Sequence, residues 1–298
     1  MKYRAFGSMI AMAAVLAVVS LAPAPVAGQA PAASHWNPPR LPDGRPDMQG
    51  LWIADAVGAA HSVEDGREQE SDIIQGRVGE RNPIVIVEPA DGRIPYQPGP
   101  AARRKELLVG IFTPTKMEHV DPHVRSLLDG VPRNIYVPGG FQLRQTPGLM
   151  EILYESNHAY RTIPMDGRPH VGENIKLWMG DSRGHWEGNT LVVDVTNFNE
   201  GTWFDAHASF HSDALHVVER WTMVSPDQID YTATIEDPKV FTRPWKIALT
   251  INRNKAKGYE IWEDAKHEGD RDVEHILETG RSEKAAGVTG IHEHHRER

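Results

Sequence analysis

The sequence predicts a mainly β protein, an antiparallel meander that forms a lipocalin-like barrel or sandwich. Three observations predict this class: short apolar runs that alternate with polar residues, turn residues between these runs, and few stretches of helical period. Alternation with a period of two marks a strand with one buried face. Short strands joined by short turns favour antiparallel pairing. We also expect long irregular N-terminal segments and a short C-terminal helix.

The expected strands concentrate after residue 148. A hairpin is expected to turn on Gly188-Asn189, because this pair suits a tight connection between two strands. In the N-terminal half, Gly50-Leu51-Trp52 opens a strand, and helices are expected over 101–108 and 71–76. A further helix is expected over 272–286. The expected strands in the second half are 149–155, 158–164, 176–179, 190–196, 215–224, 229–236, 245–251 and 259–263.

Four segments divide the chain. Residues 1–30 resemble a secretory signal peptide: Lys2 and Arg4, then an apolar run over 9–22, then small residues. A retained membrane anchor is the alternative, but the run is short for a bilayer span. We therefore expect a periplasmic or secreted protein without stable membrane insertion. The other expected segments are a strap and loop-rich region with few strands (31–147), an antiparallel β core (148–271), and a helix with a charged tail (272–298).

Composition narrows the classes of partner. The formal net charge is −9, and it becomes −11 without residues 1–30, which carry two basic residues and no acid. An acidic chain is a poor candidate for nucleic-acid binding. The sequence has no cysteine, which excludes disulfides and thiolate chemistry. We expect a small-molecule partner, and the sequence indicates no oligomeric state.

The central run, 210–224, places one acidic residue on an apolar face. Glu219 shares its predicted face with Val217 and Trp221. Burying a carboxylate costs free energy unless it is paired with a cation or has a role in a site. Apolar surroundings raise the pKa of such a carboxylate toward neutrality. Glu219 could then act as a general acid or base. The alternative is an internal ion pair with an arginine such as Arg161 or Arg183.

The candidate site is built around this carboxylate. We predict Glu219 as the catalytic acid or base, His211 as its partner, and Asp181 with Arg183 as the positioning pair. An arginine could hold a carboxylate or phenolate of the substrate. No cofactor is expected. The predicted substrate-binding residues are Asp213, Arg161, Trp186, Trp221 and Glu236.

Two further patterns are weighed and set aside. His207 and His211 are four residues apart, as metal ligands on a helix would be, but the segment lacks helical period and His216 lies on the opposite face to Glu219. We expect no metal. Ser182 stands in Gly-Asp-Ser-Arg-Gly, which we expect to form a turn. A nucleophile elbow joins a strand to a helix, but a hairpin follows here.

Two long motifs carry a resemblance. The segments GDSRGHWEGNTLVVD (180–194) and FHSDALHVVER (210–220) resemble a large family of exported, mostly uncharacterised bacterial proteins that share GDSRGxWEGxTLVVD and FHSDALHVVER. The segments 121–123, 145–148, 158–161 and 235–238 are similar to the same family. The resemblance covers roughly residues 35–275 and implies export, without an activity.

Three hypotheses of function follow. The first is an exported, cofactor-independent enzyme that performs acid/base chemistry, as a lyase, isomerase or hydrolase, on a small, partly apolar molecule in a β-barrel pocket. The second is a lipocalin-like periplasmic ligand-binding protein without catalysis, in which polar inward residues only orient the ligand. The third is a structural envelope protein, which predicts no pocket larger than a few waters.

Overall fold

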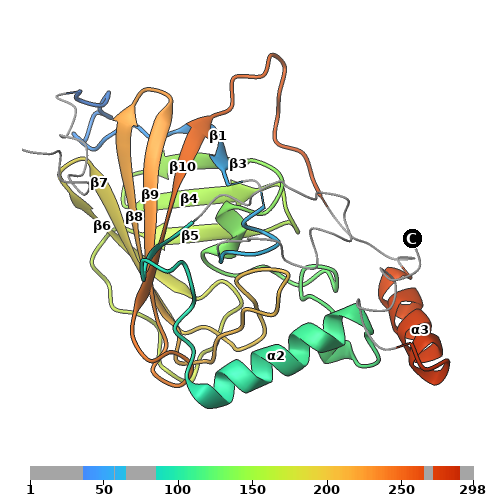
Figure 1. Cartoon of the computed structure of the whole chain (residues 1–298). Coiled ribbons are helices and arrows are strands. Elements are labelled where there is room, and N and C mark those ends of the chain that lie inside the picture. Colours follow the sequence, from blue (N-terminus) through green and yellow to red (C-terminus); the bar gives the residue numbers. More distant parts are fainter. Residues whose placement is uncertain (1–35, 57, 65–84, 265–270, 289–298) are drawn as a thin grey trace, which may run out of the picture. The chain divides into compact units, whose positions relative to one another are not determined.

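The computed structural model describes residues 36–56, 58–64, 85–264 and 271–288. The predicted signal segment, the helix expected over 71–76 and the end of the charged tail lie outside the described residues. The described part contains one ten-stranded antiparallel sheet and two α-helices (Figure 1). The strands are β1 (Gly50–Asp55), β2 (Ile86–Glu88), β3 (Phe141–Thr146), β4 (Leu149–Tyr154), β5 (Tyr160–Pro164), β6 (Asp181–Glu187), β7 (Thr190–Thr196), β8 (His216–Ser225), β9 (Gln228–Glu236) and β10 (Trp245–Arg253).

The sheet is nearly closed into a barrel, which confirms the predicted fold class. Its main path runs β5-β4-β3-β1-β10-β9-β8-β7-β6, and β2 pairs with β10 beside this path. In Figure 1, β3, β4 and β5 run across the direction of β6–β10. Such coiling brings the two ends of the path, β5 and β6, toward each other.

In the described residues, no backbone ladder joins β5 to β6, the two ends of the main path. The main path has nine strands, and every neighbouring pair is antiparallel, so β5 and β6 run in the same direction. We call the line between β5 and β6 the seam. Side chains join it: Arg161 Nη2 donates to Ser182 Oγ at 3.0 Å. A Cβ added to Gly184 would lie only 2.8 Å from Ile163 Cγ2, so the strands approach closely there.

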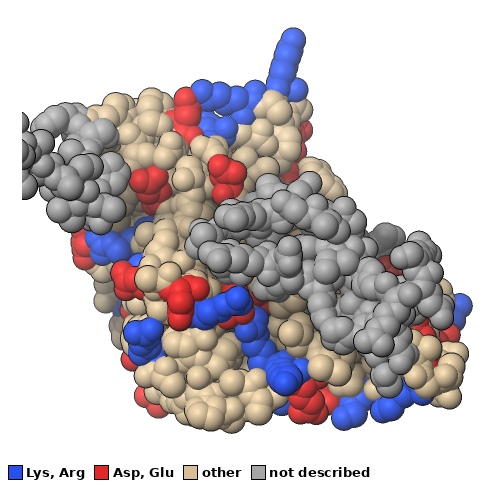
Figure 2. Space-filling view, viewed as in Figure 1, with Lys and Arg blue, Asp and Glu red and all other residues tan. Residues whose placement is uncertain are grey.

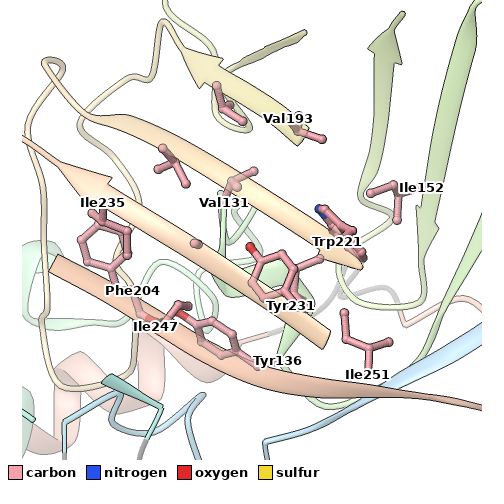
Figure 3. Packing of buried hydrophobic residues seen from close by; sticks show 14 of the residues in the cluster. Val131, Tyr136, Ile152, Val193, Phe204, Trp221, Tyr231, Ile235, Ile247 and Ile251 are labelled. Atoms are coloured by element: carbon pink, nitrogen blue, oxygen red, sulfur yellow. Dashed lines mark hydrogen bonds between the residues drawn. The ribbon is translucent and has the colours of Figure 1, made fainter. Parts of the chain in front are cut away.

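The inward faces of β8 and β9 form the centre of the core, as the alternation predicts. Val217, Trp221 and Tyr231 are buried, and Figure 3 shows the Tyr231 ring beside Trp221 among aliphatic side chains. The centroids of these two rings are 4.9 Å apart, edge to face. Removing this much apolar surface from water is the main force that holds the sheet together. The predicted inward residues of these strands are all buried: Leu215, Val217, Glu219, Trp221, Met223, Ile229, Tyr231, Ala233 and Ile235.

Several predicted elements differ in the structure. The strand β3 was not predicted, because the region is rich in proline and glycine; Pro147-Gly148 is the two-residue turn of the β3–β4 hairpin, with Thr146 opposite Leu149. The strand expected over 259–263 is absent. The Tyr259 side chain instead turns to Glu155, and β10 is already flanked by β9, β1 and β2. Residues 176–179 form one bridge, Leu177 to Phe198, and no strand.

The Gly-Asp-Ser-Arg-Gly motif was expected to be a turn, and this is wrong. Asp181, Ser182 and Arg183 lie within β6, opposite Thr196, Val195 and Asp194 of β7. Only Gly180, with φ of +65°, lies in the preceding turn. The strand arrangement places Ser182 inward and buried.

The helices lie at one end of the strands. The helix α2 (Pro98–Phe112) is longer than the predicted 101–108, because Pro98 and Pro100 suit a first helical turn. The helix α3 (Asp272–Ala285) confirms the predicted C-terminal helix, and Arg281 Nε donates to Thr115 O. Short 3₁₀ turns cover Met117–His119 and Arg133–Ile135. Among the described helices, none has the length and apolar character needed to cross a bilayer. Acidic and basic side chains intermix on the face shown in Figure 2.

Candidate functional site

The carboxylate of Glu219 is sealed inside the barrel and paired. Its side chain has no exposure to solvent. Arg161 Nη1 donates to Oε1 at 3.1 Å and Nη2 donates to Oε2 at 2.5 Å, while the Tyr231 hydroxyl donates to Oε1 at 2.8 Å. The ion pair with an arginine, which the sequence left as the alternative to a catalytic role, is therefore present, with Arg161 as the partner.

The partner arginine is held in its charged form. Burial alone would lower the pKa of Arg161, but the neighbouring Glu219 raises it above its ordinary value. The charges of the two side chains therefore balance within the barrel. Tyr154 lies close by, and burial raises the pKa of its hydroxyl to about 12, with the positive charge of Arg161 acting in the opposite direction. Tyr154 is thus protonated at neutral pH.

Arg161 also lines a cleft that opens at the seam. This seam cleft has a volume of about 320 Å³. Its floor carries the polar residues Arg161, Asp181 and Ser182, and its walls are mostly apolar. Tyr160 and Leu177, which also line it, are 66% and 38% exposed and present apolar surface at the cleft. The residues that line it are Leu128, His158, Ala159, Tyr160, Arg161, Thr162, Leu177, Trp178, Met179, Gly180, Asp181 and Ser182.

Residues 177–180 form one wall of the seam cleft. The segment 171–177 leads into this wall, and His170 fastens it to the sheet. His170 Nδ1 lies 2.9 Å from Asp181 Oδ2, and its Nε2 lies 2.7 Å from Asp194 Oδ1. His216 Nε2 lies 2.8 Å from the other oxygen of Asp194. Burial would raise the pKa of Asp194, but the hydrogen bonds from His216 and His170 hold it below its ordinary value.

The predicted positioning pair is formed. Arg183 Nη1 donates to Asp181 Oδ1 at 2.7 Å. Asp181 lines the seam cleft and also accepts the Val171 amide. The pair therefore stabilises the cleft wall, and its predicted role in positioning a substrate stays a prediction.

His211 lies apart from Glu219 in the described structure. Its Nδ1 donates to Ser212 O at 2.8 Å, and its Nε2 accepts the Thr202 hydroxyl at 2.6 Å. The rings of Phe198 and Phe204 lie against it. Burial lowers the pKa of His211, and this donor and acceptor pattern fits the neutral ring. The structure thus gives His211 a place in the core.

The remaining predicted substrate-binding residues are dispersed. Asp213 pairs with Lys239 at 2.6 Å, and Glu236 is exposed at the end of β9. Trp221 is buried beside Tyr231, while Trp186 is partly buried at the end of β6. Of the five residues predicted for substrate binding, Arg161 is the one that lines the seam cleft.

Sequence reasoning did not assign a role to a second polar cluster. Asp129 is buried and lies 2.9 Å from His123 Nδ1, while the Asn157 amide lies 3.2 Å from the same nitrogen. Arg133 donates to both oxygens of Asp121 at 2.8 and 2.7 Å. A buried aspartate that orients a partly exposed histidine is an arrangement found in acid/base sites. The available signal was Asp121-Pro122-His123, which contributes to the family resemblance.

No group of three or more His, Asp or Glu side chains in the described ranges is arranged to hold a metal ion. His207 donor and acceptor atoms face backbone and neighbouring side chains: its amide donates to Asp205, and its Nδ1 contacts His61 O. His216 Nε2 contacts Asp194 Oδ2.

Comparisons with known proteins do not assign this chain to a family. No family model matches the chain, and no curated protein matches it. A solved structure described as EF1p2_mFAP2b bound to DFHBI is 18% identical, over 39% of this chain and 79% of that chain, with a TM-score of 0.22. At that TM-score the likeness supports no conclusion about this protein.

Proposed function

We propose that the protein binds a small, partly apolar molecule in the seam cleft. The observation that carries this proposal is a cleft of about 320 Å³ with exposed apolar side chains at its rim and the buried Arg161 at its floor. Small-molecule sites combine a mostly apolar lining with a few fixed polar groups in this way. The side-chain closure of the seam leaves this opening, because no backbone ladder joins β5 to β6.

The pairing of Glu219 supports binding over catalysis by this residue. Both of its oxygens accept charged or hydroxyl donors, and the side chain has no exposure. A general acid or base must reach the proton that it transfers. Within the proposed site, Glu219 instead fixes Arg161 in place beneath the ligand.

A direct binding measurement tests the proposal. A thermal-shift screen of aromatic, terpenoid and sugar compounds should give at least one that stabilises the protein, and calorimetry should measure its affinity. Ligand at a hundred times its Kd adds about 2.7 kcal/mol of stability. For a chain of this length, each kcal/mol shifts Tm by roughly 2–4 °C.

Two variants locate the binding site. Trp178→Ala removes a wall of the seam cleft and should weaken binding at least tenfold. Ile53→Ala removes an exposed apolar side chain of β1 that does not line the cleft, and affinity should stay unchanged. Equal effects of both variants, or no binder in the whole screen, would refute binding in the cleft.

The second candidate function is acid/base catalysis, and the His123–Asp129 pair favours it. Asp129 has no exposed side-chain surface, whereas the His123 side chain is 25% exposed. Leu128, the neighbour of Asp129, lines the seam cleft, as does His158, the neighbour of Asn157. If a ligand found in the screen is chemically converted, Asp129→Asn should lower kcat at least tenfold and leave its Kd within twofold. An unchanged kcat would remove His123 from the mechanism.

Export to the periplasm or the outside is a further part of the proposal. Its support is the sequence of residues 1–30 and the family resemblance of the long motifs. Cell fractionation of the full chain, with N-terminal sequencing of the product, tests it. Recovery of uncleaved protein from the cytosol alone would contradict export.

A further inference from the structure

We infer that the pocket at the β9–β10 loop is a second binding site, and that its ligand is a small zwitterion with an apolar side chain, such as an amino acid or a short peptide with free ends. This loop pocket has a volume of about 540 Å³, which lies within the range of small-molecule sites. Three prolines and Phe241 line it together with the charged residues Glu236, Asp237 and Arg243. No residue lines both the loop pocket and the seam cleft, so the two sites are separate.

Two opposite charges of the loop pocket are unpaired in the part of the chain that the structure describes. Glu236 and Arg243 are both exposed, and neither side chain forms a hydrogen bond or an ion pair with another described residue. A neighbouring charge on the same loop does have a partner, since Lys239 Nζ lies 2.6 Å from Asp213 Oδ1. The loop pocket therefore presents one carboxylate and one guanidinium that a ligand can contact.

The strand register places these two charges on the two arms of one loop. Ile235 of β9 lies opposite Trp245 of β10, so Glu236 begins one arm of the loop and Arg243 lies near the end of the other. Opposite charges on neighbouring strands stabilise a sheet when they pair, but these two do not pair with each other. A ligand with an ammonium and a carboxylate group complements both. The guanidinium suits the carboxylate, because its N–H donors match the two oxygens.

Hydrogen bonds fix the backbone beside each of the two charges. Asp237, which follows the free carboxylate in the chain, accepts the Ser212 amide at 2.6 Å and the Ser212 hydroxyl at 2.9 Å. Thr242, which precedes the free guanidinium, donates its amide to Pro95 O at 2.8 Å. The two arms are therefore held in place before a ligand binds, which reduces the entropy lost on binding.

The rest of the lining offers an apolar surface to the ligand. The Phe241 ring packs edge to face against Tyr96 and Trp245. Gln97 Nε2 donates to Pro238 O at 2.8 Å and to Phe241 O at 3.1 Å, which joins the loop to the start of α2. An aliphatic side chain of the ligand can lie on this surface while the charged ends contact the two arms.

The distribution of charge selects a zwitterion over a simple acid or amine. A carboxylate without an ammonium group would add a negative charge to a pocket that already contains Glu236 and Asp237. An amine without a carboxylate would place a positive charge beside Arg243 and leave the guanidinium unpaired. Like charges repel, so each of these ligands gains one contact and loses part of that gain.

Three probes that differ only at their ends test the inference: leucyl-leucine, its N-acetyl form and its amide form. By calorimetry at pH 7 and low salt, we expect the dipeptide with free ends to bind at least fivefold tighter than either blocked form. The same three forms of leucine extend the test to a single residue. A preference for the free-ended form in either series supports the inference. No binding in either series, or a blocked form that binds as tightly as the free-ended one, would overturn it.

Four variants locate the contacts. Arg243→Gln should weaken the free-ended dipeptide at least fivefold and leave its amide within twofold. Glu236→Gln should weaken the free-ended dipeptide by a similar factor and leave the N-acetyl form within twofold. Arg144→Gln and Glu151→Gln are the matched controls, because these residues lie opposite each other on β3 and β4, outside the loop pocket, and affinity should not change. An equal loss for all three forms, or the same loss in the controls, would contradict the assignment.

Discussion

Arg161 on β5 and Glu219 on β8 form a two-pronged ion pair across the interior of the barrel, with distances of 3.1 and 2.5 Å. The same guanidinium donates to Ser182 on β6 at 3.0 Å. One side chain therefore ties together the two edges of the sheet and a strand of its core. The seam is closed by this contact where backbone pairing is absent.

Glu219→Gln should destabilise the protein strongly. The variant leaves the Arg161 charge buried and uncompensated, and breaking a buried pair from one side costs about 3–5 kcal/mol. Urea unfolding measures the free energy. Glu187→Gln is the control, because Glu187 pairs with Arg220 at an exposed position, where water screens such a pair and it contributes little to stability. A loss below about 1 kcal/mol for Glu219→Gln would show that the pair is not the anchor of the fold.

Gly184→Ala should also destabilise, by roughly 1–3 kcal/mol. The added Cβ would clash with Met165 Sδ and would lie 2.8 Å from Ile163 Cγ2 across the seam. Gly99→Ala serves as the comparison, since no atom lies within 4 Å of its added Cβ and alanine favours the helix α2. Chemical unfolding measures the free energy of unfolding of both variants. Equal stability of the two would mean that β5 and β6 are not in close contact at this point.

Stability should decrease with acidification below about pH 6.5, the ordinary pKa of histidine. Burial lowers the pKa of His211 in the folded protein, so below pH 6.5 the unfolded chain takes up a proton that the native one does not. The contribution is complete above pH 6.5 and is lost as the pH falls toward the folded value. His211→Asn should reduce the slope of unfolding free energy against pH between 6.5 and 5. An unchanged slope would exclude His211 as its source.

His170→Ala should loosen the wall of the seam cleft. The variant removes contacts to Asp181 and Asp194, so the segment 171–177 should open more often. We expect hydrogen exchange at the Val171 amide to become about tenfold faster, a change of roughly 1.4 kcal/mol in local opening. His185→Ala, which removes an exposed histidine beside Glu187, should leave this exchange unchanged. If both variants exchange at the wild-type rate, the wall is held by Asn197 and other contacts instead.

The sequence predicted the β class, the inward face of β8 and the burial of Glu219, because all three depend on a local period of two. It also named Arg161 as one of two possible partners. It could not choose between Arg161 and Arg183, since that choice depends on how β5 and β6 meet, 21 residues apart in the chain and at opposite ends of the sheet. The seam cleft could not be predicted from the sequence either, because it forms where β5 and β6 meet.

The sequence predictions were wrong at two places where proline and glycine residues form part of the sheet and do not end a strand. The sequence places the end of the loop-rich region at Pro147, but Pro147-Gly148 forms the turn of the β3–β4 hairpin. The glycines around Ser182 suggested a turn, although Gly184 lies within β6 where Met165 and Ile163 leave no space for a side chain. Both cases needed the register of neighbouring strands, which no single stretch of sequence contains.

A crystal structure with a ligand from the thermal-shift screen bound tests the central claim most directly. We predict the ligand between Tyr160 and Trp178 in the seam cleft, with the Arg161–Glu219 pair intact. An empty cleft with the ligand bound elsewhere, or a ligand that displaces Glu219 from Arg161, would contradict the account.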